Sequence, residues 1–230
     1  MRFSVVIGNP PYQSGKINVA LWPRFWSRAF DLVRDDGVVS LVTPRTWCGP
    51  GGQVFGEHKI MGHRRLWDVF NKFTTRAAVW GLDRHFPGVG SSFSVVTVFM
   101  DGCDGLSFLG EDFDVSLGFY PLSGVEEVRK QLAMTNNIKT NYRMSQTWED
   151  SLRVSIPKTR HVSEETVEVV LAGGTPLYKI DPRLATYVFP DTVAQAENVR
   201  RRVVECADVL NKHCRYTGFL EHRVLERVTL

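Results

Sequence analysis

The fold of the amino-terminal part of the chain is decided by the stretch Phe3-Ser4-Val5-Val6-Ile7-Gly8-Asn9-Pro10-Pro11-Tyr12. An apolar run with the length of a strand leads into a loop in which two prolines fix φ and remove two N–H donors. Pro10 also favours an extended conformation at Asn9, so the carbonyl oxygens of the loop point in set directions. The sequence therefore predicts a cluster of hydrogen-bond acceptors at the end of a strand.

Acceptors in this arrangement suit the activation of an exocyclic amine on a nucleic-acid base. The lone pair of such an amine is delocalised into the ring, and acceptors that hold both of its hydrogens favour a pyramidal, more nucleophilic nitrogen. The Asn9 side-chain oxygen and the Pro10 carbonyl are the candidate acceptors, and Tyr12 is a candidate stacking surface for a base taken out of the duplex. The alternative interpretation is a polyproline turn with Tyr12 packed on the surface.

The residues that follow predict a parallel crossover unit. Helical spacing of apolar residues indicates an amphipathic helix over 21–33, and Asp35-Asp36-Gly37 indicates a turn. Residues 38–43 read as a buried strand that Pro44 closes. Because ligand sites in such sheets collect beyond the carboxyl ends of the strands, we expect residues 9–12 and 43–47 to share one edge. Thr43 and Pro44 are then expected to shape the wall of the pocket.

The order of these segments resembles the catalytic half of gamma-class, adenine-specific DNA methyltransferases of the NPPY type, found in type II and IIG restriction-modification systems and in bacteriophages. Residues 86–98 resemble the glycine-and-aromatic hairpin of that family, whose aromatic residue contacts the extruded base. The resemblance implies a catalytic loop made of Asn9, Pro10, Pro11 and Tyr12, and a target-base pocket between Tyr12 and Phe93. For Phe93 the alternative is a core aromatic residue at the start of a strand. The resemblance further implies S-adenosylmethionine as the methyl donor and no metal.

The expected architecture is α/β. Residues 1–105 are interpreted as the catalytic half of a methyltransferase domain with a partial Rossmann-like sheet, and residues 106–230 as a smaller α+β target-recognition region. The boundary is placed where residues 101–105 interrupt the strand pattern. Near the carboxyl end, Asp191-Thr192 predicts the cap of a helix, in a segment that resembles the end of phage and type IIG specificity regions.

Basic residues supply the candidate contacts to double-stranded DNA, and they are Arg64, Arg65, Arg143, Arg200 and Arg201. Each also has a plain interpretation as part of a solvated surface. The net charge of +3 permits DNA binding without arguing for it.

Composition limits the remaining possibilities. A chain of 230 residues that is 43% hydrophobic can bury a full core. No stretch has the apolar length of a membrane span or the pattern of a signal sequence, so we expect a cytoplasmic protein, in the host cytoplasm if a phage encodes it. The spacing of the four cysteines fits neither a zinc knuckle nor a dense disulfide framework, and free thiols are expected.

The sequence does not show the cofactor-binding segment that the methyltransferase resemblance calls for. S-adenosylmethionine would need a glycine-rich turn and an acidic residue after the next strand, and no residues before Met1 supply them. We therefore expect adenine methylation by a split enzyme in which a second chain or dimer mate covers the incomplete sheet and binds the cofactor. The alternative is a catalytically reduced protein that binds DNA or a host protein, for example an anti-restriction or regulatory factor. A third possibility is an interaction module in which NPPY is incidental.

Overall fold

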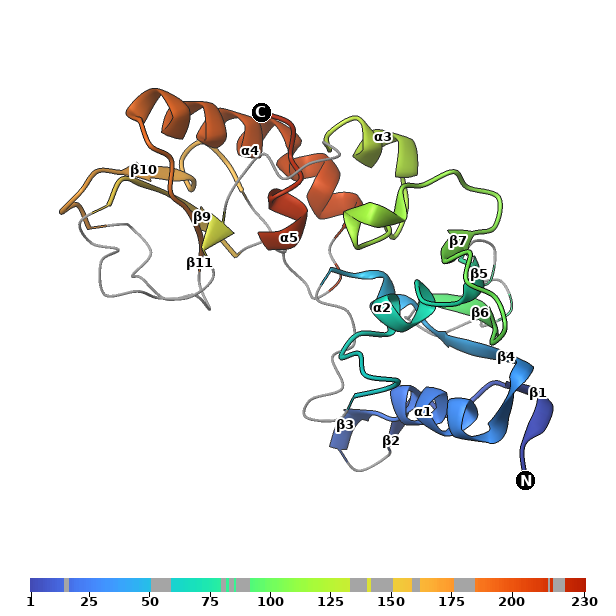
Figure 1. Ribbon diagram of the computed structural model, residues 1–230. Coiled ribbons are helices and arrows are strands. Elements are labelled where there is room, and N and C mark those ends of the chain that lie inside the picture. Colours follow the sequence, from blue (N-terminus) through green and yellow to red (C-terminus); the bar gives the residue numbers. More distant parts are fainter. Residues whose placement is uncertain are drawn as a thin grey trace. The chain divides into compact units, whose positions relative to one another are not determined.

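The computed structural model of the chain divides into two compact units, Met1–Phe119 and Tyr120–Leu230 (Figure 1). The residues that it describes are 1–14, 17–50, 59–79, 82, 85, 92–132, 140–141, 151–158, 162–175, 185–214, 216 and 222–230. The first unit continues past residue 105 because β7 (Leu106–Phe108) pairs in parallel with β5 (Thr74–Ala78). The roles assigned above to the two regions remain predictions.

A five-stranded mixed sheet forms the centre of the first unit. Its strands lie in the order β1-β4-β6-β5-β7, with β1 (Phe3–Gly8) at one edge next to β4 (Val33–Pro44) and with β6 (Phe93–Phe99) in the middle. β1 and β4 run parallel, whereas β6 is antiparallel to both of its neighbours, β4 and β5. This mixed α/β arrangement is compatible with a methyltransferase-like fold.

The predicted crossover unit is confirmed. After β1 the chain forms a short hairpin of β2 (Gln13–Ser14) and β3 (Ile17–Ala20), then α1 (Trp22–Leu32), and then enters β4. The turn expected at residues 35–37 instead lies within β4 as a bulge, because the pairing with β1 shifts register between Phe3↔Val33 and Val5↔Val38. A Cβ on Gly37 would lie 2.8 Å from the Ser4 carbonyl oxygen, so the bulge requires glycine.

One face of the sheet is covered by α1, by the 3-10 turn η1 (Arg45–Cys48) and by α2 (Leu66–Phe70). Their aromatic side chains form a cluster in which the rings of Trp26 and Trp47 lie 4.9 Å and 5.0 Å from the ring of Phe70. Trp47 also stacks on Phe108 of β7 at 6.0 Å. Aromatic contacts of this kind add to the stabilisation that burial itself provides.

On the opposite face of the same sheet most of the described side chains are half-buried or exposed, whereas Pro44 and Phe93, at the end next to residues 9–12, are buried. The strand register places on it Val5, Ile7, Val38, Ser40, Val42, Val95, Thr97, Phe99, Thr74, Arg76, Ala78 and Ser107. Exposure is largest on the edge strand, at 57% for Val5 and 74% for Ile7. Parallel strand pairs are normally covered on both faces, so this apolar edge is unusual for such a fold.

The second unit is built on a four-stranded antiparallel sheet of β10 (Glu168–Val170), β9 (Arg153–Pro157), β11 (Ala185–Val188) and β8 (Thr140–Asn141), in that order. The helix α4 (Val193–His213) packs against β9 and β10 and buries Val199, Val203, Ala207 and Leu210. Its predicted amino-terminal cap is confirmed, because Thr192 and Gln195 form a capping box. The shorter elements are α3 (Val125–Arg129) and α5 (His222–Leu225), and η3 (Val115–Leu117) closes the first unit.

Among the described residues, no helix has both the length and the apolar composition that crossing a bilayer requires. The four cysteines are free thiols, of which Cys103 is exposed and the other three are buried.

Candidate active site

Three separate segments meet at the carboxyl ends of β1 and β4. Residues 9–12 follow β1, Thr43 and Pro44 end β4, and Phe93 opens β6 as the register partner of Pro44. The structure thus brings the predicted catalytic loop, the predicted pocket wall and the predicted second aromatic residue to one edge of the first unit.

The loop Asn9–Tyr12 is held at both of its ends. It continues directly from β1, and the Tyr12 carbonyl accepts a hydrogen bond of 2.9 Å from the Leu21 N–H just before α1. Pro10 is buried, Asn9 and Pro11 are exposed, and Tyr12 is half-buried. The backbone of the loop is therefore fixed, while the Asn9 side chain can reach a molecule from solvent.

Tyr12 has two side-chain contacts within the site. Its hydroxyl donates a hydrogen bond to Asn9 Oδ1. Its ring centroid lies 5.0 Å from that of Phe93, with an angle of 37° between the ring planes. Burial raises the pKa of Tyr12, and the hydrogen bond with Asn9 opposes this shift. The hydroxyl is consequently protonated at neutral pH.

Phe93 is both a core residue and a wall of the site. Its side chain is only 1% exposed, as the core interpretation requires, yet one side of its ring meets Tyr12. The two interpretations of Phe93 do not exclude each other.

A buried hydroxyl network lies behind this wall. The Ser94 hydroxyl accepts from Trp47 Nε1 at 2.9 Å and donates to the Thr43 carbonyl at 3.2 Å, and its oxygen lies 3.3 Å from Thr43 Oγ1. All three side chains are fully buried. Thr43 therefore supports the site from within, and Ser94 is a second supporting residue, which no pattern in the sequence singles out.

An open groove of about 330 Å³ runs beside the loop, between β1 and α1. Its lining is largely apolar and includes Val6, Ile7, Asn9, Pro10, Phe25 and Arg28. Among the described residues of this lining, Arg28 carries the only formal charge, and none has a carboxylate side chain. The groove therefore suits an apolar group better than a polar ligand with several hydroxyls.

The two predicted DNA-binding residues of the first unit, Arg64 and Arg65, differ in exposure and in their contacts within the protein. Arg64 is exposed. Arg65 is largely buried, donates from Nη2 to the Gly118 carbonyl at 2.8 Å and lies 3.8 Å from Asp68. The guanidinium of Arg65 thus ties two parts of the first unit together.

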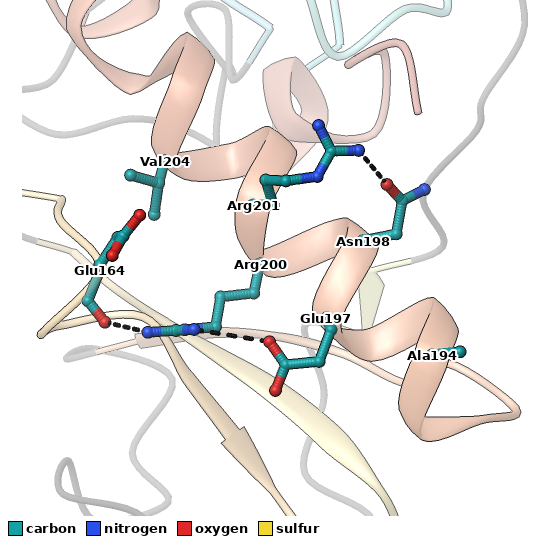
Figure 2. A pocket seen from close by; sticks show the side chains of 7 residues that line it. All are labelled: Glu164, Ala194, Glu197, Asn198, Arg200, Arg201 and Val204. Atoms are coloured by element: carbon teal, nitrogen blue, oxygen red, sulfur yellow. Dashed lines mark hydrogen bonds and ion pairs between the residues drawn. The ribbon is translucent and has the colours of Figure 1, made fainter.

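A similar division separates two of the three arginines of α4, Arg200 and Arg201, which line an open hollow of about 440 Å³ (Figure 2). Arg200 donates to the carbonyls of Val167 and Glu164 at 2.8 Å and 2.6 Å, with Glu197 at 3.4 Å. The side chain of Arg201 is 62% exposed, and its contacts among the described residues are with Asn198 and Glu205 of the same helix. Arg143 lies outside the described residues.

The fold and the site together define a mixed α/β protein with a proline-fixed loop at the carboxyl end of an edge strand. The chain was also compared with known protein families. Residues 1–75 match the model of the Eco57I restriction-modification methylase family. No curated protein matches the chain. The matched segment contains β1, the loop, α1, β4 and α2, and it links this part of the chain to methylases of restriction-modification systems.

Proposed function

We propose that this protein takes part in methylating the exocyclic amine of adenine in DNA. The observation that carries the proposal is the meeting of Asn9, Pro10 and Tyr12 with Phe93 at the carboxyl end of β1. The match of residues 1–75 to a restriction-modification methylase family supports methylation of DNA in general. The preference for adenine comes from the resemblance of the NPPY loop.

Each residue of the site has a role in this proposal. The Asn9 side-chain oxygen and the Pro10 carbonyl each accept one hydrogen of the amine, which favours a pyramidal nitrogen with an available lone pair. Tyr12 and Phe93 provide aromatic surfaces for a base that has left the duplex. Thr43 and Pro44 close the pocket behind it.

The proposed methyl donor is S-adenosylmethionine, but the groove beside the loop does not fit it. The ribose hydroxyls of this cofactor call for a carboxylate and its sulfonium for an electron-rich neighbour, whereas the lining offers apolar side chains and the Arg28 cation. We therefore assign no cofactor contact to these residues.

We further propose that a strand of a second polypeptide, carrying the cofactor-binding residues, adds to the free edge of β1. The support is the edge itself, where Phe3, Val5 and Ile7 are 43%, 57% and 74% exposed. β1 contains no charge and no proline, the features that usually protect an edge strand from pairing. Added strands gain affinity from main-chain hydrogen bonds and specificity from alternate side chains.

Double-stranded DNA is the proposed substrate, and the second unit is the proposed recognition region. Arg64 and Arg201 are the best placed of the predicted phosphate contacts, because both are exposed. Arg65 and Arg200 are less suitable, since their guanidinium groups already donate to backbone carbonyls.

A second candidate function is DNA or protein binding without catalysis. The observation that favours it is the groove beside Asn9, in which no described lining residue offers a carboxylate to a cofactor. In this alternative the base pocket persists as a binding site only.

Mass spectrometry of nucleosides tests the proposal, after duplex DNA has been incubated with S-adenosylmethionine, with the second polypeptide that co-purifies with the chain from its source cells, and with either the wild-type chain or Asn9→Ala. N6-methyladenine that forms with the wild type and not with Asn9→Ala is the expected result. Methylation retained by Asn9→Ala would refute the role of the loop. The second candidate instead predicts that both proteins bind DNA in calorimetric titration and that neither forms N6-methyladenine, even with the second polypeptide present.

A further inference from the structure

In the empty protein, the side chain of Tyr12 occupies two positions that a target base needs. Its hydroxyl donates to Asn9 Oδ1, the acceptor assigned above to the amine. Its ring contacts the ring of Phe93, the surface assigned to the base. Tyr12 therefore stands where the substrate would stand, with a donor at the amine position and an aromatic ring at the base position.

The distance between the rings shows that no base fits between them as they lie. A base stacked between two rings needs about 3.5 Å on each side, or about 7 Å between the outer ring planes. The centroids of Tyr12 and Phe93 are 5.0 Å apart. One of the two rings has to move before a base can enter.

Tyr12 is the ring that is able to move. Phe93 is 1% exposed, and its backbone is paired with Pro44 inside the sheet. Tyr12 is half-buried and lies in a loop, with its carbonyl held by the Leu21 N–H. The motion is thus a rotation of the Tyr12 side chain on a fixed backbone.

We propose that Tyr12 caps its own active site: it holds Asn9 and Phe93 in the empty protein and rotates away to become a stacking surface when a base enters. This inference rests on the proposed function, because the base pocket is part of that proposal. The cap makes binding of a base compete with an internal hydrogen bond. The apparent affinity for the base is then reduced by the fraction of molecules that are capped.

The cap predicts opposite effects for two substitutions at the same position. Tyr12→Phe keeps the ring and removes the hydroxyl that holds Asn9, so it should bind an extruded base about fivefold more tightly, the equivalent of one ordinary hydrogen bond. Tyr12→Ala removes the stacking surface as well and should bind about fivefold more weakly, since the loss of stacking on one ring, about thirtyfold, outweighs the about fivefold gain from removing the cap.

The first measurement uses the free protein and no DNA. Fluorine NMR of the full chain labelled with 3-fluorotyrosine gives a Tyr12 resonance, assigned by its loss in Tyr12→Phe. Asn9→Ala should shift this resonance, because it removes the acceptor of the hydroxyl. An unshifted resonance would overturn the cap whatever the protein does with DNA.

The second measurement uses a short duplex with 2-aminopurine opposite an abasic site, which lowers the cost of extruding the base. Fluorescence titration should show tighter binding for Tyr12→Phe and weaker binding for Tyr12→Ala, and in an Asn9→Ala background Tyr12→Phe should have no effect. Equal affinities of the wild type and Tyr12→Phe, together with weaker binding by Tyr12→Ala, would overturn the cap. A different result would overturn the base pocket of the proposed function. In that result Asn9→Ala shifts the Tyr12 resonance, but the wild type and all variants bind the 2-aminopurine duplex with the same affinity. Tyr12 would then have no bound base to compete with.

Discussion

Replacing Ser94 with alanine should destabilise the first unit, because it breaks the hydroxyl network behind the site. Ser94→Ala removes the acceptor of Trp47 Nε1 and the donor to the Thr43 carbonyl. Trp47 is 0% exposed, so its N–H has no access to water after the change. A buried donor without a partner costs about 1–3 kcal/mol, and the lost bond to the carbonyl adds about 1 kcal/mol. We expect a loss of about 3 kcal/mol in the free energy of unfolding.

Urea denaturation followed by tryptophan fluorescence measures this loss, since most tryptophans lie in the first unit. Ser107→Ala is the matched control. Ser107 also bonds within the sheet, to Arg76 and to the Thr75 carbonyl, but it lies on the open face. The control should change stability by less than about 0.5 kcal/mol.

A double-mutant cycle identifies the cause. When Trp47→Phe removes the N–H that Ser94 accepts, Ser94→Ala should cost less, with a coupling energy of about 1–2 kcal/mol. The reasoning is refuted if Ser94→Ala and Ser107→Ala have equal effects, or if the coupling between Ser94 and Trp47 is zero.

Three further predictions concern the edge strand, the arginines of α4 and a buried histidine. Ile7→Lys should reduce self-association of the chain in light scattering, because Ile7 lies on the free edge of β1, whereas Leu109→Lys should not, although Leu109 is 53% exposed. Arg201→Ala should weaken duplex binding and lower its salt slope by about one, and Arg200→Ala should instead cost about 1–2 kcal/mol in stability. Burial, and secondly the charge of Lys212, lowers the pKa of His213 below its ordinary value of 6.5. As the pH falls, the unfolded chain therefore protonates this histidine at a higher pH than the folded chain does. Stability from His213 is therefore complete above about pH 6.5 and is lost as the pH falls through the lower folded pKa, a dependence that His213→Gln should remove in denaturation at different pH values.

Each of these predictions has a contrary outcome. Equal light scattering by the two lysine variants would show that the edge of β1 does not drive association. A salt slope that changes with Arg200→Ala and not with Arg201→Ala would reverse the assignment on α4. Identical pH profiles for wild type and His213→Gln would show that the histidine is solvated in the folded state.

The segment from β1 to β4 could be predicted from the sequence because its signals are local. An apolar run before Asn9, helical spacing in 21–33 and a proline at 44 each act within a few residues, and the crossover follows from their order. The capping box of α4 is equally local, since it involves Thr192 and Gln195.

What the sequence did not reveal depends on contacts between distant residues. β6 lies between β4 and β5 although β5 precedes it in the chain, and no local pattern encodes that insertion. The network around Ser94 and the contact of Tyr12 with Phe93 exist only after this insertion. The bulge at residues 35–37 was mistaken for a turn, because the same residue types favour both structures.

The place of β6 has a consequence for how such a chain can be divided in evolution. The similarity to the methylase family ends at residue 75, yet the strand that joins β4 to β5 comes after it. A gene cut at that point would still encode the whole NPPY loop. It would lose Phe93 and leave β4 without its second neighbour. The segment that matches the family and the smallest piece that contains both rings of the proposed base pocket are therefore different lengths of chain.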